Sequence, residues 1–114
     1  MVKVLKLNSI SPKVNDVLDK NYEITSECDN PELILVRSAQ MADYVLPESV
    51  VAIGRAGAGV NNIPHAEYAK RGVVVFNSPG ANANAVKELV ITALLLSCRK
   101  IIEGCLLYTS DAAD

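Results

Sequence analysis

The sequence predicts an α/β fold built on a parallel sheet. Short apolar runs rich in valine, isoleucine and leucine alternate with segments of helical periodicity, a pattern typical of βαβ units. The runs at 33–36, 50–53 and 73–76 contain no polar residue, as expected for parallel strands covered on both faces. The 114 residues, half of them apolar, are enough for one compact core.

Four further short elements are expected. Two are strands, at 2–7 and, more weakly, at 23–26, and two are helices, at 10–18 and 64–70. In the first strand, apolar and polar residues alternate. In the first helix, the apolar residues fall on one face. In the second, Pro64 is tolerated in the first turn, and Gly72 lies just past the end, where a left-handed residue is often needed. Helices between strands imply right-handed crossovers.

A long apolar helix of about twenty residues is expected after Gly80. Asn82 or Asn84 can cap its first turn. Apolar residues from Val86 to Ile102 cover most of its circumference, which is typical of a helix buried on several sides. We therefore expect 82–104 to link this part to a second domain, and the uncovered surface of Val86–Ile102 to drive self-association.

Residues 105–114 read CLLYTSDAAD and fit no pattern of the preceding chain. One back-translation of this stretch matches the end sequence of a transposase-type sequencing adapter. We therefore expect 105–114 to be translated adapter, and the chain to be a fragment of a longer protein. The alternative is that 105–114 is a natural, disordered C-terminus.

The composition favours a cytoplasmic protein that binds a small molecule. The net charge is −2 with both signs interspersed, so neither nucleic acid nor a membrane surface is an expected partner. The three cysteines, Cys28, Cys98 and Cys105, have no metal-ligand spacing and are expected to be free thiols. No apolar run approaches the roughly twenty residues of a membrane span, and no metal site is expected.

A glycine-rich turn, residues 54–62, follows the apolar run 50–53 and reads GRAGAGVNN. Glycines allow a ligand to approach the main chain, and successive N–H groups can hold a carboxylate or phosphate. The third glycine of a dinucleotide fingerprint would fall at Asn62, so a small anionic group is favoured over a pyrophosphate. Arg37–Ser38 and 77–80 follow two other strands, and all three clusters should meet at one edge of the sheet.

Two of these residues have alternative interpretations. Arg37 offers a planar fork of donors to a carboxylate or phosphate, but it could also be a solvated arginine at a strand end. Ser38 could contact a ligand or cap a helix that begins at Ala39.

Three motifs occur in the order of one known family: 36–38 (VRS), 55–63 (RAGAGVNNI) and 76–89 (FNSPGANANAVKEL). Together they resemble the D-isomer-specific 2-hydroxyacid dehydrogenases over residues 1 to about 104. The resemblance implies a flavodoxin-like substrate domain, here 1–81, a linking helix and a separate Rossmann domain that binds NAD. Within the family it implies oxidation of 3-phosphoglycerate to 3-phosphohydroxypyruvate in serine biosynthesis, by a homo-oligomer.

The resemblance also assigns roles to single residues. The backbone N–H groups of Ala58 and Gly59 match the turn that holds the substrate carboxylate, and Arg37 and Ser38 match residues that hold substrate, Arg37 facing its phosphate. Ala58 and Asn82 match residues beside the nicotinamide, Asn82 also lying near substrate. The catalytic arginine, the glutamate–histidine pair and the NAD fingerprint match nothing in this sequence, so we expect the fragment to be inactive.

Two alternatives stay open. Another dehydrogenase of the family, acting on glycerate, lactate or hydroxypyruvate, would share the glycine-rich turn but would have less use for Arg37. A free-standing flavodoxin-like binding module is the other. A receiver-type module is excluded because Asn8-Ser9 and Arg37-Ser38 stand where its acidic residues would be, whereas a flavin-binding module lacks only the expected phosphate loop after the first strand.

Overall fold

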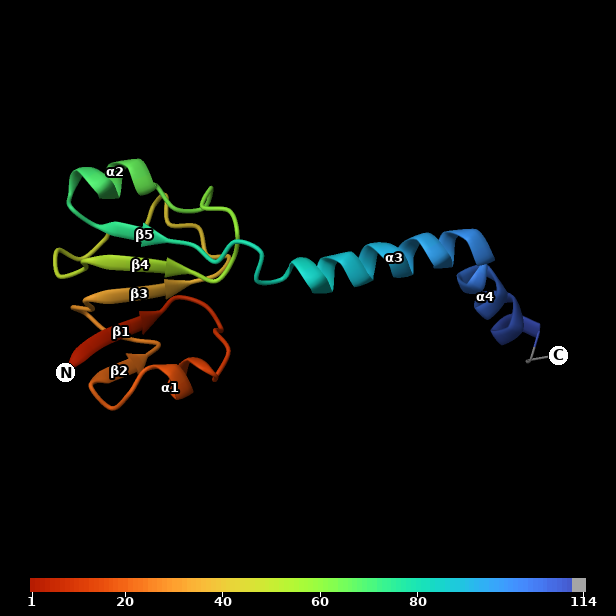
Figure 1. The fold of residues 1–114 in the computed structure, drawn as a ribbon, viewed down its shortest axis with the longest axis horizontal. Coiled ribbons are helices and arrows are strands. Elements are labelled where there is room, and N and C mark those ends of the chain that lie inside the picture. Colours follow the sequence, from red (N-terminus) through yellow and green to blue (C-terminus); the bar gives the residue numbers. More distant parts are fainter. Residues whose placement is uncertain (112–114) are drawn as a thin grey trace. The chain divides into compact units, whose positions relative to one another are not determined.

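The computed structural model describes residues 1–111 and contains a five-stranded, wholly parallel sheet (Figure 1). The strands are β1 (Val2–Lys6), β2 (Tyr22–Thr25), β3 (Leu33–Val36), β4 (Ala52–Arg55) and β5 (Val74–Phe76). Their order in the sheet is β2-β1-β3-β4-β5. This is the flavodoxin-like order, in which the topology switches direction between β1 and β3. The predicted α/β class and parallel sheet are therefore confirmed.

The helices of the described chain are α1 (Val14–Val17), α2 (His65–Lys70), α3 (Ala83–Arg99) and α4 (Ile101–Asp111). The chain divides into two compact units, Met1–Ala81 and Asn82–Asp114. The sheet, α1 and α2 belong to the first unit, and α3 and α4 belong to the second.

The core of the first unit lies on one face of the sheet. The strand register places Leu5, Ile34, Ile53 and Val75 side by side on that face. They pack against the segment between β3 and β4 and against α2, through residues such as Met41. The buried apolar residues of this cluster are Leu5, Ile34, Val36, Met41, Leu46, Val50, Ile53, Ile63, Tyr68 and Val73.

The opposite face of the sheet is covered unevenly. Val4 is fully buried there, but at the β5 edge the side chains of Val74 and Phe76 are 51% and 60% exposed. The expectation that the run 73–76 is covered on both faces is therefore wrong. An apolar run alone does not distinguish a central strand from an edge strand whose second face has no cover.

Two predicted elements differ from the structure in their limits. The expected helix 10–18 is reduced to α1, because turns at Ser11 and Pro12 precede it and Leu18 is already extended. The strand expected at 50–53 is shifted to Ala52–Arg55, because Val50 closes a turn by donating its N–H to the Pro47 carbonyl at 3.2 Å.

In the second unit, α3 ends earlier than expected. Lys100 adopts a left-handed conformation with φ of 50°, and the helix direction changes there before α4 begins. Nothing in the sequence around Lys100 explains this break. Helix α4 continues past Gly104 through residues 105–111. Residues 112–114 of the expected adapter tail lie outside the described residues.

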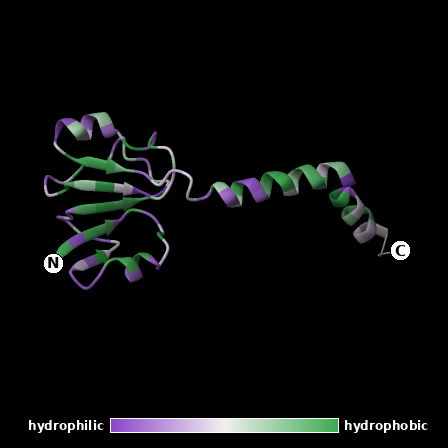
Figure 2. Ribbon diagram, in the orientation of Figure 1, coloured by the Kyte–Doolittle hydropathy of each residue, from purple (hydrophilic) through white to green (hydrophobic). Residues whose placement is uncertain are grey.

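No residue of α3 is buried, and Figure 2 shows the apolar character along much of its length. Leu89, Leu94 and Leu95 are 69%, 61% and 60% exposed. A hollow of about 390 Å³ lies where α3 meets α4, lined by Ala93, Leu96, Ser97, Ile102 and Glu103. The second unit therefore has a large apolar surface and no core of its own among the described residues.

Candidate functional site

Hydrogen bonds join the segments that follow β3, β4 and β5 at the carboxyl edge of the sheet. Arg55 Nε donates to the Arg37 carbonyl at 2.9 Å, which joins the β3 and β4 ends. The hydroxyl of Ser78, after β5, donates to the Arg55 carbonyl at 3.2 Å. The three polar clusters predicted from the sequence are thus brought together, next to the switch point where ligands bind in folds of this order.

The carbonyl groups of the glycine-rich turn accept hydrogen bonds from Arg55 and from the segment after β5. Asn77 Nδ2 donates to the Ala58 carbonyl at 2.7 Å, and the Ser78 N–H donates to the Gly57 carbonyl at 2.9 Å. Arg55 donates from its guanidinium to the Gly59 carbonyl. Within residues 1–111, the N–H groups of Gly57, Ala58 and Gly59 donate no hydrogen bond. The turn can therefore offer successive donors to an anion.

The glycines of this turn have a steric role that the sequence did not indicate. Neither Gly57 nor Gly59 has a positive φ. A Cβ at Gly57 would lie 3.2 Å from Arg55 Cζ, and one at Gly59 would lie 3.3 Å from an Arg55 terminal nitrogen. The absent side chains leave room for the Arg55 guanidinium, which holds the turn against the β3 end.

Arg37 and Ser38 lie directly after β3, with exposed side chains that make no hydrogen bond to other described residues. The described chain has no helix between β3 and β4, so Ser38 does not cap a helix at Ala39, which was the alternative to ligand contact. The Ser38 N–H instead donates to Asn8. The Arg37 guanidinium is free to bind an anion near the carboxyl edge.

Asn82 occupies the N-cap position of α3, but its side chain makes no capping hydrogen bond. It belongs to the second unit, whereas the other predicted site residues belong to the first.

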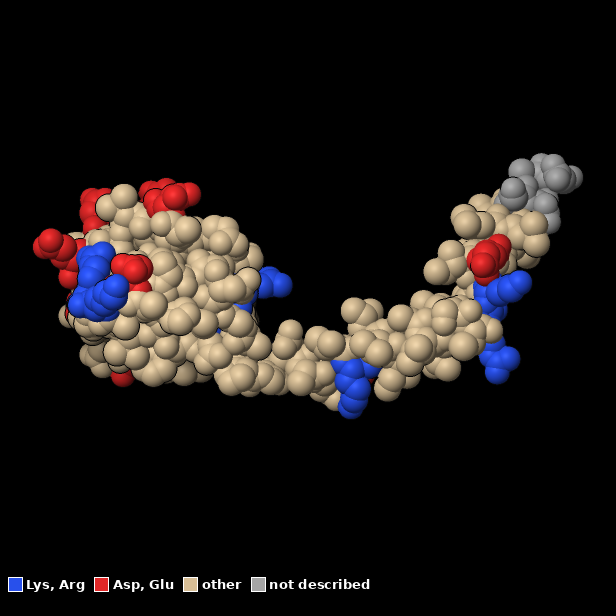
Figure 3. Space-filling view, turned by 90° about the horizontal axis from the view of Figure 1, so that it is seen from above, with Lys and Arg blue, Asp and Glu red and all other residues tan. Residues whose placement is uncertain are grey.

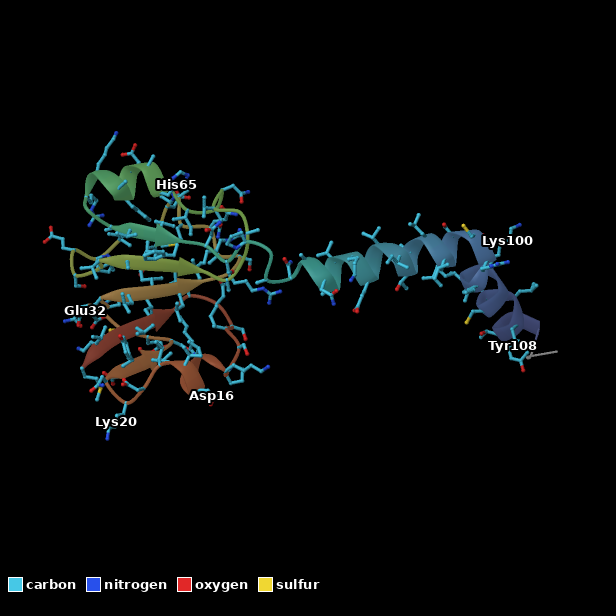
Figure 4. The ribbon with its side chains drawn as sticks, in the orientation of Figure 1. Asp16, Lys20, Glu32, His65, Lys100 and Tyr108 are labelled. Atoms are coloured by element: carbon cyan, nitrogen blue, oxygen red, sulfur yellow. The ribbon has the colours of Figure 1, made fainter. Side chains whose placement is uncertain are left out.

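The single histidine, His65, is exposed at the first turn of α2 (Figure 4).

Sequence reasoning missed two asparagines that organise the site. Asn8 accepts three backbone N–H groups of the Arg37 segment, and Asn62 donates to the carbonyls of Arg37 and Ala39 at 3.4 and 2.9 Å. Asn62 is only 4% exposed, and its Oδ1 atom has no hydrogen-bond partner among the described residues. The only signal in the sequence was position. Asn8 directly follows the strand expected at 2–7, and Asn62 ends the glycine-rich turn.

Other expectations concern what the chain does not bind. Cys28, Cys98 and Cys105 are free, as predicted. On the face shown in Figure 3, acidic and basic side chains of the first unit lie close together. Residues 1–111 contain no group of three or more histidine, cysteine or acidic residues placed to hold a metal ion. Over the same residues, none of the helices combines the length and apolar character needed to span a membrane.

Comparison with known proteins agrees with this architecture. Residues 2–114 match the family described as "D-isomer specific 2-hydroxyacid dehydrogenase, catalytic domain". The chain is 34% identical over 115 residues to D-3-phosphoglycerate dehydrogenase of Archaeoglobus fulgidus, covering 88% of this chain and 22% of that relative. It is 34% identical over 82 residues to the enzyme of that name from Rattus norvegicus, covering 69% of this chain and 15% of the relative.

A shorter match, 46% identical over 57 residues, is found with D-3-phosphoglycerate dehydrogenase of Escherichia coli K12, covering 50% of this chain and 14% of that relative. The chain thus spans about a fifth or less of the length of these relatives. On the extent of the family match, the chain belongs to the D-isomer specific 2-hydroxyacid dehydrogenase family.

Proposed function

We propose that this chain is the substrate-binding part of an NAD-dependent dehydrogenase that oxidises 3-phosphoglycerate to 3-phosphohydroxypyruvate in serine biosynthesis. Membership of the family implies an oxidoreductase that acts on a CH–OH group. Three relatives that carry the name D-3-phosphoglycerate dehydrogenase support the phosphorylated substrate.

One observation of the structure carries the proposal: the glycine-rich turn presents unengaged N–H groups at the carboxyl edge that also carries Arg37. In the proposed complex, the N–H groups of Ala58 and Gly59 bind the substrate carboxylate. Arg37 binds the phosphate, and Ser38 contributes a hydroxyl. Two anionic groups on one small molecule would thus meet two kinds of donor on one edge of the sheet.

NAD would supply the hydride acceptor, and Ala58 and Asn82 are the residues that we propose to border its nicotinamide. The carboxamide of Asn82 is not used for capping, which leaves it available for this role. The turn at 54–62 does not suit the cofactor pyrophosphate, because α2 begins only at His65 and the turn does not open a helix. We propose that the main NAD site lies in the separate NAD domain of the whole protein.

The proposal includes an organisation for the whole protein. Residues 1–81 form the N-terminal part of the substrate domain, 82–104 lead toward an NAD domain, and 105–114 are translated adapter. We place the whole protein in the cytoplasm as a homo-oligomer, and we expect the fragment to associate through Val86–Ile102. Sequencing the source DNA across the codons for 102–114 tests the assignment of the tail.

Binding of two acids to the purified chain tests the substrate class. In isothermal titration calorimetry, 3-phosphoglycerate should bind about tenfold or more tightly than glycerate, since a charge-assisted hydrogen bond contributes roughly 1.5–3 kcal/mol. Arg37→Ala should remove this preference, whereas Arg99→Ala, an exposed arginine of α3, should retain it. No turnover is expected with NAD, because the glutamate–histidine pair that the family uses to accept the hydroxyl proton matches nothing in this sequence.

Three results would contradict the proposal in different ways. Equal affinity for both acids would favour another 2-hydroxyacid dehydrogenase. Absorbance of the purified protein in the flavin bands, without acid binding, would favour a free-standing flavodoxin-like module. Measurable oxidation of 3-phosphoglycerate by the pure chain would refute its expected inactivity.

A further inference from the structure

Asn8 connects the end of β1 to the segment after β3. Its Oδ1 atom accepts the backbone N–H groups of Arg37, Ser38 and Ala39 at 2.9, 3.1 and 3.0 Å. Three successive N–H groups that converge on one oxygen form the kind of concavity that elsewhere in proteins binds an anion. Here a neutral amide oxygen from the same chain fills it.

The carbonyl side of the same segment is held as well. The Arg37 carbonyl accepts from Arg55 Nε at 2.9 Å and from Asn62 Nδ2 at 3.4 Å, and the Ala39 carbonyl accepts from Asn62 Nδ2 at 2.9 Å. The backbone of this segment is therefore fixed from both sides. The side chains of Arg37 and Ser38 make no hydrogen bond to other described residues and are exposed.

Exposed backbone N–H groups at the end of a strand do not need a protein acceptor, because water can accept their hydrogen bonds. Asn8 lies 29 to 31 residues from these N–H groups in the sequence, and its contacts fix the direction of their peptide planes. A backbone fixed before binding lowers the ordering cost when Arg37 engages a ligand. The contacts of Asn8 therefore have a consequence for binding beyond that for folding.

We propose that Asn8 is a positioning residue, whose side-chain oxygen sets the Arg37–Ala39 backbone so that Arg37 and Ser38 can bind the phosphorylated acid. This rests on the proposed function for the identity of the ligand. What Asn8 contributes is acceptor capacity, so aspartate, which accepts the same N–H groups, should replace it, and alanine should not.

Two measurements on the 114-residue chain test this role, with variants Asn8→Ala and Asn8→Asp. Asn15→Ala, at an exposed asparagine of α1, is the matched control. Hydrogen–deuterium exchange of peptides that cover 36–40 should accelerate by roughly tenfold in Asn8→Ala and stay near the original rate in the other two. Affinity for 3-phosphoglycerate should fall roughly fivefold in Asn8→Ala, the cost of ordering about one side chain, and stay unchanged in Asn15→Ala.

The outcomes separate this role from the proposed function. Unchanged exchange in Asn8→Ala would refute the three hydrogen bonds. Faster exchange with unchanged affinity in Asn8→Ala would refute positioning and leave only a structural role. If the unaltered chain bound no 3-phosphoglycerate, the proposed function would fail and with it the role of Asn8 toward that ligand, whatever the exchange rates were.

Discussion

The two units of this chain use apolar residues in opposite ways. In Met1–Ala81, isoleucine, valine and leucine side chains gather on one face of a sheet, and Ile34 and Ile53 are fully buried. In α3 and α4, residues of the same types are exposed, among them Ile91 at 49%. Apolar content thus indicates that a segment is to be buried but does not indicate by what. The first unit supplies its own cover, whereas α3 has none among the described residues.

The largest expected effect compares isoleucine in the two units. Ile34→Ala should destabilise the first unit by about 2–5 kcal/mol, because it removes buried methyl groups and leaves a cavity in the β3 layer of the core. Ile91→Ala should change the free energy of unfolding by no more than about 0.5 kcal/mol, since that side chain is already half exposed. Urea denaturation followed by circular dichroism measures both values. When both are measured on the dissociated monomer, similar losses for the two variants would show that Ile91 is buried within the chain itself.

The apolar surface of α3 should make the chain associate. Replacing Leu89, Leu94 and Leu95 together by glutamine preserves helix propensity and removes apolar surface. The apparent dissociation constant of the associated form should rise about tenfold, equivalent to about 1.4 kcal/mol. Sedimentation velocity over a range of concentrations measures this change.

Val45→Gln is the control for that variant, because Val45 is 88% exposed but lies in the first unit. It should leave the dissociation constant unchanged. A monodisperse monomer of the unaltered chain would contradict the expected association itself.

The strands could be predicted from the sequence because their cause is local. The runs at 33–36 and 73–76 are apolar over their whole length, and turns bound them, so the structure differs there by at most one residue. The clusters at the carboxyl edge could be predicted for the same reason, since each directly follows a strand. Parallel pairing then brings the clusters to one edge.

What could not be predicted depends on contacts between distant residues. Asn8 reaches Arg37 across 29 residues, and no pattern near Asn8 indicates that its oxygen accepts three N–H groups. The glycine-rich turn was assigned to anion binding because glycines let a ligand approach the main chain, whereas Gly57 also makes room for the Arg55 side chain. These two features are fixed by packing in space and not by periodicity. The left-handed Lys100 has no glycine or asparagine signal at all.

The smallest expected effect compares two tyrosines and depends on pH. Tyr68 is 5% exposed, and its hydroxyl donates to the Met41 carbonyl at 3.2 Å, whereas Tyr108 in α4 is 79% exposed. Tyr68→Phe should destabilise the first unit by about 1 kcal/mol at neutral pH, because it leaves a carbonyl without its partner. Tyr108→Phe should have no measurable effect.

Burial raises the pKa of Tyr68 above 10.0, and the nearby Tyr44 raises it further, although Arg71 acts in the opposite direction. Burial also raises the pKa of Tyr44 itself. A phenol with a raised pKa in the folded state contributes stability that is fully present below the unfolded pKa of about 10 and is lost as the pH rises through the folded value. The unaltered chain should therefore lose stability above about pH 10, and Tyr68→Phe should lose less over the same range, since only Tyr44 then contributes. Urea denaturation at pH 8 and pH 10.5 measures the difference, and an equal alkaline loss in both proteins would show that Tyr68 is not buried in the folded first unit.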